Sequence, residues 1–278
     1  MNRHGYAVVD VFTERPLEGN PVAVFADGSG LDGELMQRTA RELNLSETVF
    51  VLPASDPRRA EAGVRIFTPT AELPFAGHPI LGTATLLGAE RGLELVRLET
   101  GAGPITVRLD GAYAEMEQPI PTVEPFSAPA DLLAALGAAD PVLPVEVYAN
   151  GPRHVMVALA DEAAVGALAP DLGVLARLGA IGVSCFAGQE GNYRTRMFAP
   201  GLGVPEDPAT GSAAGPLAVH LLRHGRSAAG QPIELRQGIE IGRPSVLHAR
   251  VEGSPERIER VLVGGSAVIV AHGEYRLQ

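Results

Sequence analysis

The sequence predicts an α+β protein of two similar domains, each with a central helix wrapped by a mostly antiparallel sheet. Short runs rich in β-branched residues outnumber the helical patterns, which favours this class over a doubly wound sheet. The chain also repeats itself, because the RIFTP segment at 65–69 is echoed by RMFAP at 196–200. A loop and a helix start rich in small residues follow each copy, at Gly77 and at Gly211. Two copies in 278 residues indicate two domains, because solenoids use shorter repeats and at least three of them.

The expected strands are the β-branched runs between turn-forming residues, and the first of them covers 6–12. The clearest helical patterns are at 32–44 and 211–224, where small and apolar residues recur at helical spacing. A mostly apolar helix from Gly77 or Gly211 is expected at the centre of each domain. The other expected strands are 22–25, 48–52, 64–67, 105–109, 145–148, 154–159, 193–198, 245–251 and 267–271.

A proline-rich segment at 118–125 predicts the boundary between the domains. Its three prolines, Pro119, Pro121 and Pro125, disfavour both a helix and a central strand, which indicates a linker. We therefore expect an N-terminal domain over 1–120 and a C-terminal domain over 121–278. In this division, the last strand of the chain can cross back and pair within the first domain.

Composition and charge exclude several classes of protein. The formal net charge of −11 repels phosphate backbones, so nucleic acid is not an expected partner. No apolar run approaches the roughly 20 residues of a membrane span, and no secretory leader precedes the first expected strand. The single Cys185 rules out a disulfide framework. These features predict a cytoplasmic protein without a membrane partner.

The two glycine-containing helix starts predict a site for an anion. A helix N-terminus leaves about four backbone N–H groups unpaired and carries a partial positive charge, so it binds a carboxylate without a lysine. Gly77 and Gly211 allow a ligand to approach the backbone, and the polar His78 and Ser212 occupy matching positions. A single such glycine more often serves helix packing, but the duplication favours a site. If the domains face each other, both helix starts point into one cleft.

Three side chains near these turns can carry protons. Glu47 lies where a helix gives way to a strand, His78 opens the first glycine-started helix, and Asp207 precedes Gly211 by four residues. Taken alone, each has an ordinary structural explanation, since charged side chains are mostly solvated. Beside the two helix starts, they form a candidate catalytic group.

The other histidines predict no metal site. His154 lies in a strand, and His220 and His224 lie on a helix without a ligand spacing to nearby carboxylates or cysteines. The sequence also lacks a Walker loop, a G-x-G-x-x-G turn after a first strand and a G-x-S-x-G elbow. We therefore expect neither a metal nor an organic cofactor.

Several segments together resemble the PhzF family of phenazine biosynthesis, which has the diaminopimelate-epimerase-like fold. The segments that carry this resemblance are 16–25, 44–47, 72–79 and 206–213. The similarity extends over nearly the whole chain and weakens at 53–63, at 88–96 and after Gly253. Further matches resemble the phenazine-pathway branch of the family, and they lie at 118–121, 150–155, 185–188 and 238–245.

The resemblance implies a cofactor-independent isomerase that acts on trans-2,3-dihydro-3-hydroxyanthranilate, a small carboxylate, and works as a homodimer. By motif, Glu47 matches the family's proton-shuttling glutamate, and His78 and Asp207 match its polar partners. Ser212 with the Gly211 turn matches the substrate-holding group. A free carboxylate is a weak base for this proton. We therefore expect closure of the domains to desolvate Glu47 and so to raise its pKa.

Three other functions are compatible with a protein of this fold class. Related epimerases use two cysteine thiols, and this chain has neither Cys-Gly turn, so a two-thiol racemase is excluded. A PhzF-like isomerase for another small amino or hydroxy acid stays open. A non-catalytic scaffold of the same fold is disfavoured, since it has no use for Glu47, His78, Asp207 and Ser212 together.

Overall fold

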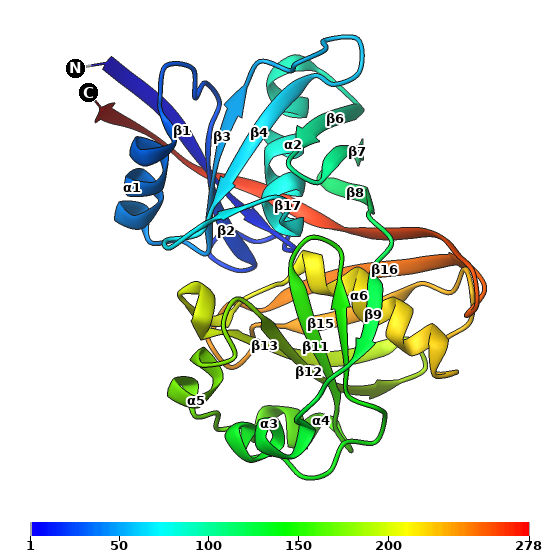
Figure 1. Cartoon of the computed structure of the whole chain (residues 1–278). Coiled ribbons are helices and arrows are strands. Elements are labelled where there is room, and N and C mark those ends of the chain that lie inside the picture. Colours follow the sequence, from blue (N-terminus) through cyan, green and yellow to red (C-terminus); the bar gives the residue numbers. More distant parts are fainter. Residues whose placement is uncertain (1, 278) are drawn as a thin grey trace. The chain divides into compact units, whose positions relative to one another are not determined.

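The computed structural model describes residues 2–277, and the chain divides into two compact units (Figure 1). Unit 1 contains the chain up to Glu117 together with the segment from Gly264 onward. Unit 2 contains Gln118–Val263. The division therefore falls three residues before the expected boundary at 120, and the C-terminal segment groups with unit 1.

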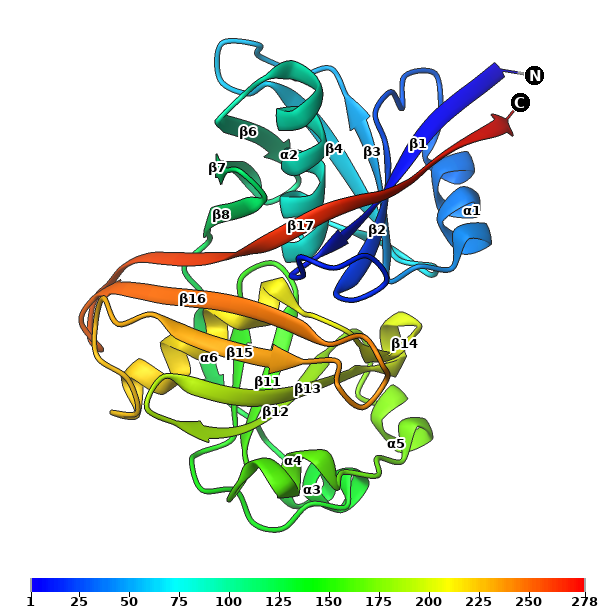
Figure 2. The same cartoon turned by 180° about the vertical axis from the view of Figure 1, so that it is seen from behind.

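Unit 1 is a mixed sheet with two helices. Its strands pair in the order β1–β2 antiparallel, β2–β3 parallel, β3–β4 antiparallel, β4–β6 parallel and β6–β7 antiparallel. The end of β17 pairs with β1, with Asn2 opposite Leu277, so the two ends of the chain are neighbours (Figure 2). The elements are β1 (Asn2–Val11), β2 (Asn20–Phe25), α1 (Gly33–Leu43), β3 (Glu47–Leu52), β4 (Ala62–Phe67), β5 (Glu72–Leu73), α2 (Gly77–Arg91), β6 (Leu95–Thr100), β7 (Gly103–Asp110) and β8 (Tyr113–Gln118).

Unit 2 has the same order of pairings. They are β10–β11 antiparallel, β11–β12 parallel, β12–β13 antiparallel, β13–β15 parallel and β15–β16 antiparallel. The elements are β9 (Thr122–Pro125), α3 (Pro129–Leu136), β10 (Glu146–Ala149), β11 (Arg153–Ala158), α4 (Glu162–Gly166), α5 (Leu172–Ala176), β12 (Gly182–Gln189), β13 (Asn192–Ala199), the 3-10 helix η1 (Pro200–Leu202), β14 (Val204–Asp207), α6 (Gly211–Arg223), β15 (Ile233–Gln237), β16 (Ser245–Gly253) and β17 (Ile258–Leu277).

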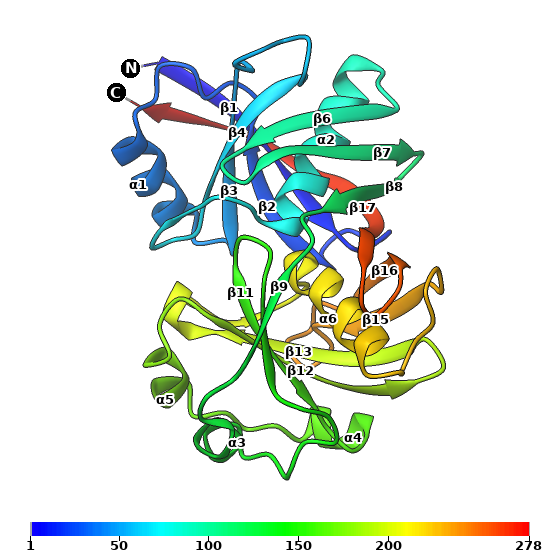
Figure 3. The same ribbon diagram turned by 45° about the vertical axis from the view of Figure 1, so that its right-hand side comes forward.

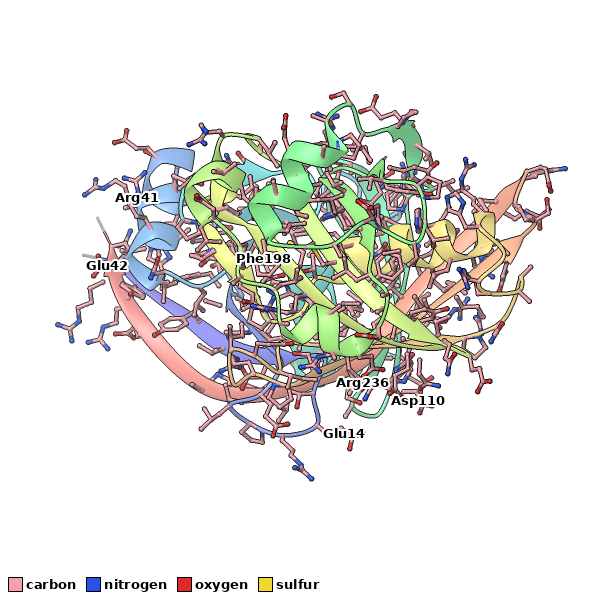
Figure 4. The ribbon with its side chains drawn as sticks, turned by 90° about the horizontal axis from the view of Figure 1, so that it is seen from below. Glu14, Arg41, Glu42, Asp110, Phe198 and Arg236 are labelled. Atoms are coloured by element: carbon pink, nitrogen blue, oxygen red, sulfur yellow. The ribbon has the colours of Figure 1, made fainter. Side chains whose placement is uncertain are left out.

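The helix α1 shows how an amphipathic pattern covers one face of the sheet. Asp32 caps its N-terminus by accepting the N–H of Leu35 at 2.8 Å. Met36 and Ala40 are buried in a cluster with three phenylalanines of the neighbouring strands. Arg41 and Glu42 lie on the exposed side of the same helix (Figure 4).

The helices α2 and α6 are buried, and they begin at Gly77 and Gly211 as the sequence predicts. Neither has a solvated stripe along most of its length, which is typical of a helix enclosed by other elements. Within unit 2, α6 lies against β16 and β11 (Figure 3). Among residues 2–277, no helix is long and apolar enough to cross a membrane.

Glycine lets α2 approach its strands closely. A Cβ atom at Gly82 would lie 2.6 Å from Val22 Cγ1 and 3.0 Å from Val11 Cγ2, and β-branched side chains have little freedom to move away. We expect Gly82→Ala to lower the free energy of unfolding by about 1 kcal/mol, because overpacking outweighs the helix propensity gained. Gly5→Ala is the control, since its Cβ would have no neighbour closer than 4.0 Å. Equal midpoints of urea unfolding for the two variants would contradict this expectation.

The proline-rich segment is more ordered than a linker. The strand β8 runs through Gln118, and β9 covers Thr122–Pro125, so only residues 119–121 lie outside regular structure. The expectation of a linker over 118–125 is therefore wrong for both of its ends. Pro125 is tolerated because it is the last residue of β9, which is a position where a missing N–H costs little.

Candidate active site

Glu47 begins β3 because α1 ends just before it. Asn44 closes α1 in the left-handed conformation, with φ at 52°, and donates its N–H to the carbonyl of Ala40 at 3.1 Å. Three residues after Asn44 the chain is extended, and Glu47 pairs with Val22 of the parallel neighbour β2. The Glu47 carboxylate therefore lies at the start of a buried strand, and its side chain is 14% exposed.

The structure brings Glu47 next to His78. His78 is the second residue of α2, and its Nε2 lies 3.4 Å from Glu47 Oε2. On the other side of the ring, Asn20 Nδ2 lies 3.2 Å from His78 Nδ1. We call Asn20, Glu47 and His78 the Glu47 group, and all three belong to unit 1.

Burial keeps the imidazole of this group neutral. It lowers the pKa of His78 to about 3, so the ring carries one proton at neutral pH. Asn20 Nδ2 lies at one ring nitrogen and Glu47 Oε2 at the other. The arrangement is a carboxylate beside a neutral imidazole rather than a fixed ion pair.

A second group of polar side chains surrounds Asp207 in unit 2. Thr210 Oγ1 donates to Asp207 Oδ2 at 2.5 Å, and Gln237 Nε2 donates to the Asp207 carbonyl at 2.8 Å. Gln237 Nε2 also donates to Thr210 Oγ1 at 3.0 Å. Asp207 is only 5% exposed, and these bonds hold its carboxylate in one orientation at the end of β14. We call these three residues the Asp207 group.

The first turn of α6 has no side-chain cap. Thr210 occupies the N-cap position, but its hydroxyl is used by Asp207, and α2 has Ala76 at the same position. The N–H groups at both helix starts therefore receive no side-chain acceptor from the cap residue. Neither Gly77 nor Gly211 has a positive φ, so these glycines are not needed for a left-handed turn. An uncapped N-terminus is suited to an anionic ligand.

Two amides bind backbone carbonyls at the start of α6, and one of them compensates for a proline inside the helix. Pro216 has no N–H, so the carbonyl of Ser212, four residues earlier, loses its helical donor. Asn150 Nδ2 replaces that donor at 2.9 Å, and Gln118 Nε2 donates to the Gly211 carbonyl at 2.8 Å. The backbone that carries Ser212 is therefore fixed from outside the helix.

The repeated RIFTP and RMFAP segments form the same contacts in both units, in which an arginine pairs with a glutamate and lies over a phenylalanine. Arg196 forms a two-pronged pair with Glu206 at 2.9 and 2.8 Å, and Arg65 forms one with Glu72 at 2.7 Å on both prongs. Each arginine also lies about 5 Å over a phenylalanine two residues later, namely Phe198 and Phe67. In unit 2, Glu206 belongs to β14, so its ion pair with Arg196 fixes the strand that ends at Asp207.

We expect the two ion pairs to differ in their contribution to stability. Arg196 and Glu206 are 9% and 13% exposed, whereas Arg65 and Glu72 are 34% and 43% exposed. Glu206→Gln should lower the free energy of unfolding by about 3 kcal/mol, because it leaves a buried guanidinium without its counter-charge. Glu72→Gln is the matched control and should cost less than about 1 kcal/mol. Denaturant unfolding of the two variants would contradict the account if they lost equal amounts.

Sequence reasoning missed the amides and one carboxylate. Asn20, Gln118 and Asn150 lie in segments that matched the PhzF family, but no role was assigned to them. The expectation that His220 and His224 have no carboxylate nearby is wrong, because Glu146 Oε2 lies 3.2 and 3.0 Å from them. His154 is buried, and neither of its ring nitrogens has a hydrogen-bond partner among residues 2–277.

Comparisons with known proteins find one family, and the matches cover nearly the full length of the chain. A family model described as phenazine biosynthesis-like protein (PhzC-PhzF) matches residues 9–273. The trans-2,3-dihydro-3-hydroxyanthranilate isomerase of Pseudomonas aeruginosa is 54% identical over 276 residues, which cover 97% of this chain and 98% of that protein. A solved PhzF-family structure from Bacillus anthracis has a TM-score of 0.85 and 26% identity and covers 100% of both chains. A predicted epimerase from Pseudomonas aeruginosa has a TM-score of 0.83 and 36% identity and covers 99% of this chain and 100% of that one.

Proposed function

This chain belongs to the phenazine biosynthesis-like protein family, and we propose that it isomerises trans-2,3-dihydro-3-hydroxyanthranilate. The observation that carries the proposal is the Glu47 group, which places a carboxylate beside a neutral imidazole at an uncapped helix start. The relative that is 54% identical bears the name of this isomerase, which supports the choice of substrate.

The proposed reaction is a proton shift that needs one carboxylate. The substrate is a cyclic diene with a carboxylate, an amine and a hydroxyl group. Glu47 takes the proton from the hydroxyl-bearing carbon and returns it to the carboxylate-bearing carbon of the same ring face. The resulting enol becomes a ketone, and two such amino-ketones condense toward a phenazine skeleton. No atom is gained or lost in the step, so no oxidant or co-substrate is required.

We assign supporting roles to the neighbouring residues. His78 lies beside Glu47, with Nε2 3.4 Å from Oε2, and its neutral state leaves the carboxylate as the base. The N–H groups of the helix starts at Gly77 and Gly211, with the Ser212 hydroxyl, hold the substrate carboxylate and its neighbours. Asp207, whose carboxylate is oriented by Thr210, acts as a polar partner in this proposal and not as a second base.

A direct assay separates this function from its alternatives. Purified protein is mixed with trans-2,3-dihydro-3-hydroxyanthranilate, and loss of the diene absorbance is followed. We expect turnover with this compound and much slower reaction with other small amino or hydroxy acids. Turnover confined to another acid would favour the alternative isomerase, and the absence of turnover with all of them would favour a scaffold.

We further propose that the protein is a homodimer in the cytoplasm and that its two units are copies of one epimerase-like domain. The repeated order of strand pairings supports the duplication. The neighbouring Ile239 and Ile241, 45% and 40% exposed, offer apolar surface for a second copy. Light scattering of the purified protein tests the dimer, and a monomer mass would refute it.

We also propose that the proton shift uses no cofactor. Glu47 supplies the base, and the neutral imidazole of His78 lies beside it, so no proposed step depends on an ion. Exhaustive dialysis against a chelator should therefore leave kcat unchanged at the assay temperature. Loss of activity that an added metal ion restores would overturn this proposal.

A further inference from the structure

A cluster of four side chains joins β10 to the C-terminal end of α6 in unit 2. Glu146 and Tyr148 are two residues apart on β10, so both point to the same face of the sheet. His220 and His224 are four residues apart at the end of α6, so they lie on the same face of the helix. We call these four residues the Glu146 cluster.

The contacts in this cluster converge on a single carboxylate oxygen. Glu146 Oε2 lies 3.2 Å from His220 Nδ1, 3.0 Å from His224 Nε2 and 2.8 Å from the hydroxyl of Tyr148. One oxygen and two ring nitrogens of three residues thus lie within 4.8 Å of one another. No function assigned above to α6 uses these side chains.

The cluster is partly buried but open at one edge. His220 is fully buried, whereas the side chains of Glu146 and His224 are 15% and 20% exposed. The cluster therefore combines one enclosed imidazole with two partly exposed side chains, through which an ion from the solvent can reach the donor atoms.

We propose that Glu146, His220 and His224 bind a divalent transition-metal ion, with Zn²⁺ as the best match. Two imidazoles and one carboxylate are a common donor set for zinc. Metal–ligand bonds of about 2.0–2.1 Å in a tetrahedral site place the donor atoms about 3.3 Å apart. The separations of 3.0 and 3.2 Å from Glu146 Oε2 are close to that spacing. The open edge leaves the fourth position for water.

The surroundings support an ion at this position. The Tyr148 hydroxyl donates to Glu146 and fixes the carboxylate, which is the usual role of an outer partner in a metal site. The ion would lie at the C-terminal end of α6, where the helix dipole favours positive charge. Arg223 is a cation that acts on both Tyr148 and His220, and its charge opposes that of a bound ion. Its substitution by Gln should therefore tighten metal binding.

The ion would have a structural role in the enzyme. His220 lies eight residues after Ser212, which is about 12 Å along the helix axis. At that distance the ion does not touch a ligand held at the first turn of α6. It would instead connect the far end of α6 to β10 and so hold the helix in place.

The test uses the full-length protein after a chelator has been removed by dialysis. Zn²⁺ is titrated in competition with a chromogenic chelator, and Co²⁺ is added separately to record the visible absorption of a tetrahedral site. The variants are Glu146→Gln and His224→Gln, both at the open edge of the cluster. His248→Gln is the matched control, because His248 also faces a carboxylate, with Nε2 3.9 Å from Glu234 Oε2, but its side chain is 41% exposed.

We expect one equivalent of Zn²⁺ to bind with a micromolar or tighter Kd and to raise the Tm. Each cluster variant should weaken binding by more than about tenfold, since losing even an outer partner of a metal ligand costs 10- to 100-fold. His248→Gln should bind as the wild type does. If wild type and Glu146→Gln bind Zn²⁺ equally, or if neither binds it, the cluster is a hydrogen-bond network only. Because binding is measured without substrate, failure here leaves the proposed isomerase function untouched.

Discussion

Glu47→Gln should reduce kcat by roughly 10²–10⁴-fold, because it removes the only base that the proposed proton shift uses. Glutamine keeps the shape of the side chain and so its contact with His78, whose Nε2 lies 3.4 Å from the carboxylate oxygen. The affinity for a non-reactive substrate analogue should therefore change little. Steady-state kinetics and equilibrium binding of the analogue measure the two effects separately.

A matched control guards against a general effect of removing charge. Glu234→Gln removes a carboxylate that also faces a histidine, His248, but its side chain is 40% exposed. This variant should keep wild-type turnover. If Glu47→Gln stayed within about threefold of the wild type, Glu47 would not be the base.

Asp207→Asn should reduce kcat/KM by roughly 10²-fold, because it removes a buried, oriented negative charge without changing the size of the side chain. Thr210 Oγ1 donates to this carboxylate at 2.5 Å, and Gln237 holds both residues. Thr210→Val removes the donor but keeps the charge, so it should cost less activity than Asp207→Asn.

The control for Asp207 is an aspartate with a purely structural role. Asp171 caps the exposed helix α5 by accepting the N–H of Val174 at 2.9 Å. Asp171→Asn should leave kcat/KM unchanged. Thermal unfolding is recorded for every variant, so that lost activity is not confused with lost folding. Wild-type kcat/KM in Asp207→Asn would remove Asp207 from the active site.

The helix starts could be predicted because their signals are local. Small residues follow Gly77 and Gly211 without interruption, and the structure begins α2 and α6 at those residues. Glu47 could be placed at the start of a strand for a similar reason, since Asn44 is a good residue for ending a helix. In each case, the residues within about ten positions of the start of the element were enough to predict it.

The partners of these residues could not be predicted, because they come from distant parts of the chain. Asn20 meets His78 across 58 residues, and Gln118 meets Gly211 across 93. Glu146 meets His220 across 74 residues, so the two histidines looked isolated in the sequence. Such contacts depend on which strands pair, and the sequence carries no short-range signal for the parallel pairs β2–β3 and β11–β12.

The central claim is that one carboxylate, Glu47, both removes and returns the migrating proton. Substrate deuterated at the hydroxyl-bearing carbon tests it in a single turnover, with the product analysed before Glu47 exchanges its deuteron with water. The account predicts a primary isotope effect, part of the label at the carboxylate-bearing carbon, and delivery to the same ring face. Loss of the label with delivery to the same face remains consistent with the account, because it means that Glu47 exchanged its deuteron with water within the turnover. Delivery of hydrogen to the opposite face would contradict the one-base mechanism and favour a pair formed by Glu47 and Asp207.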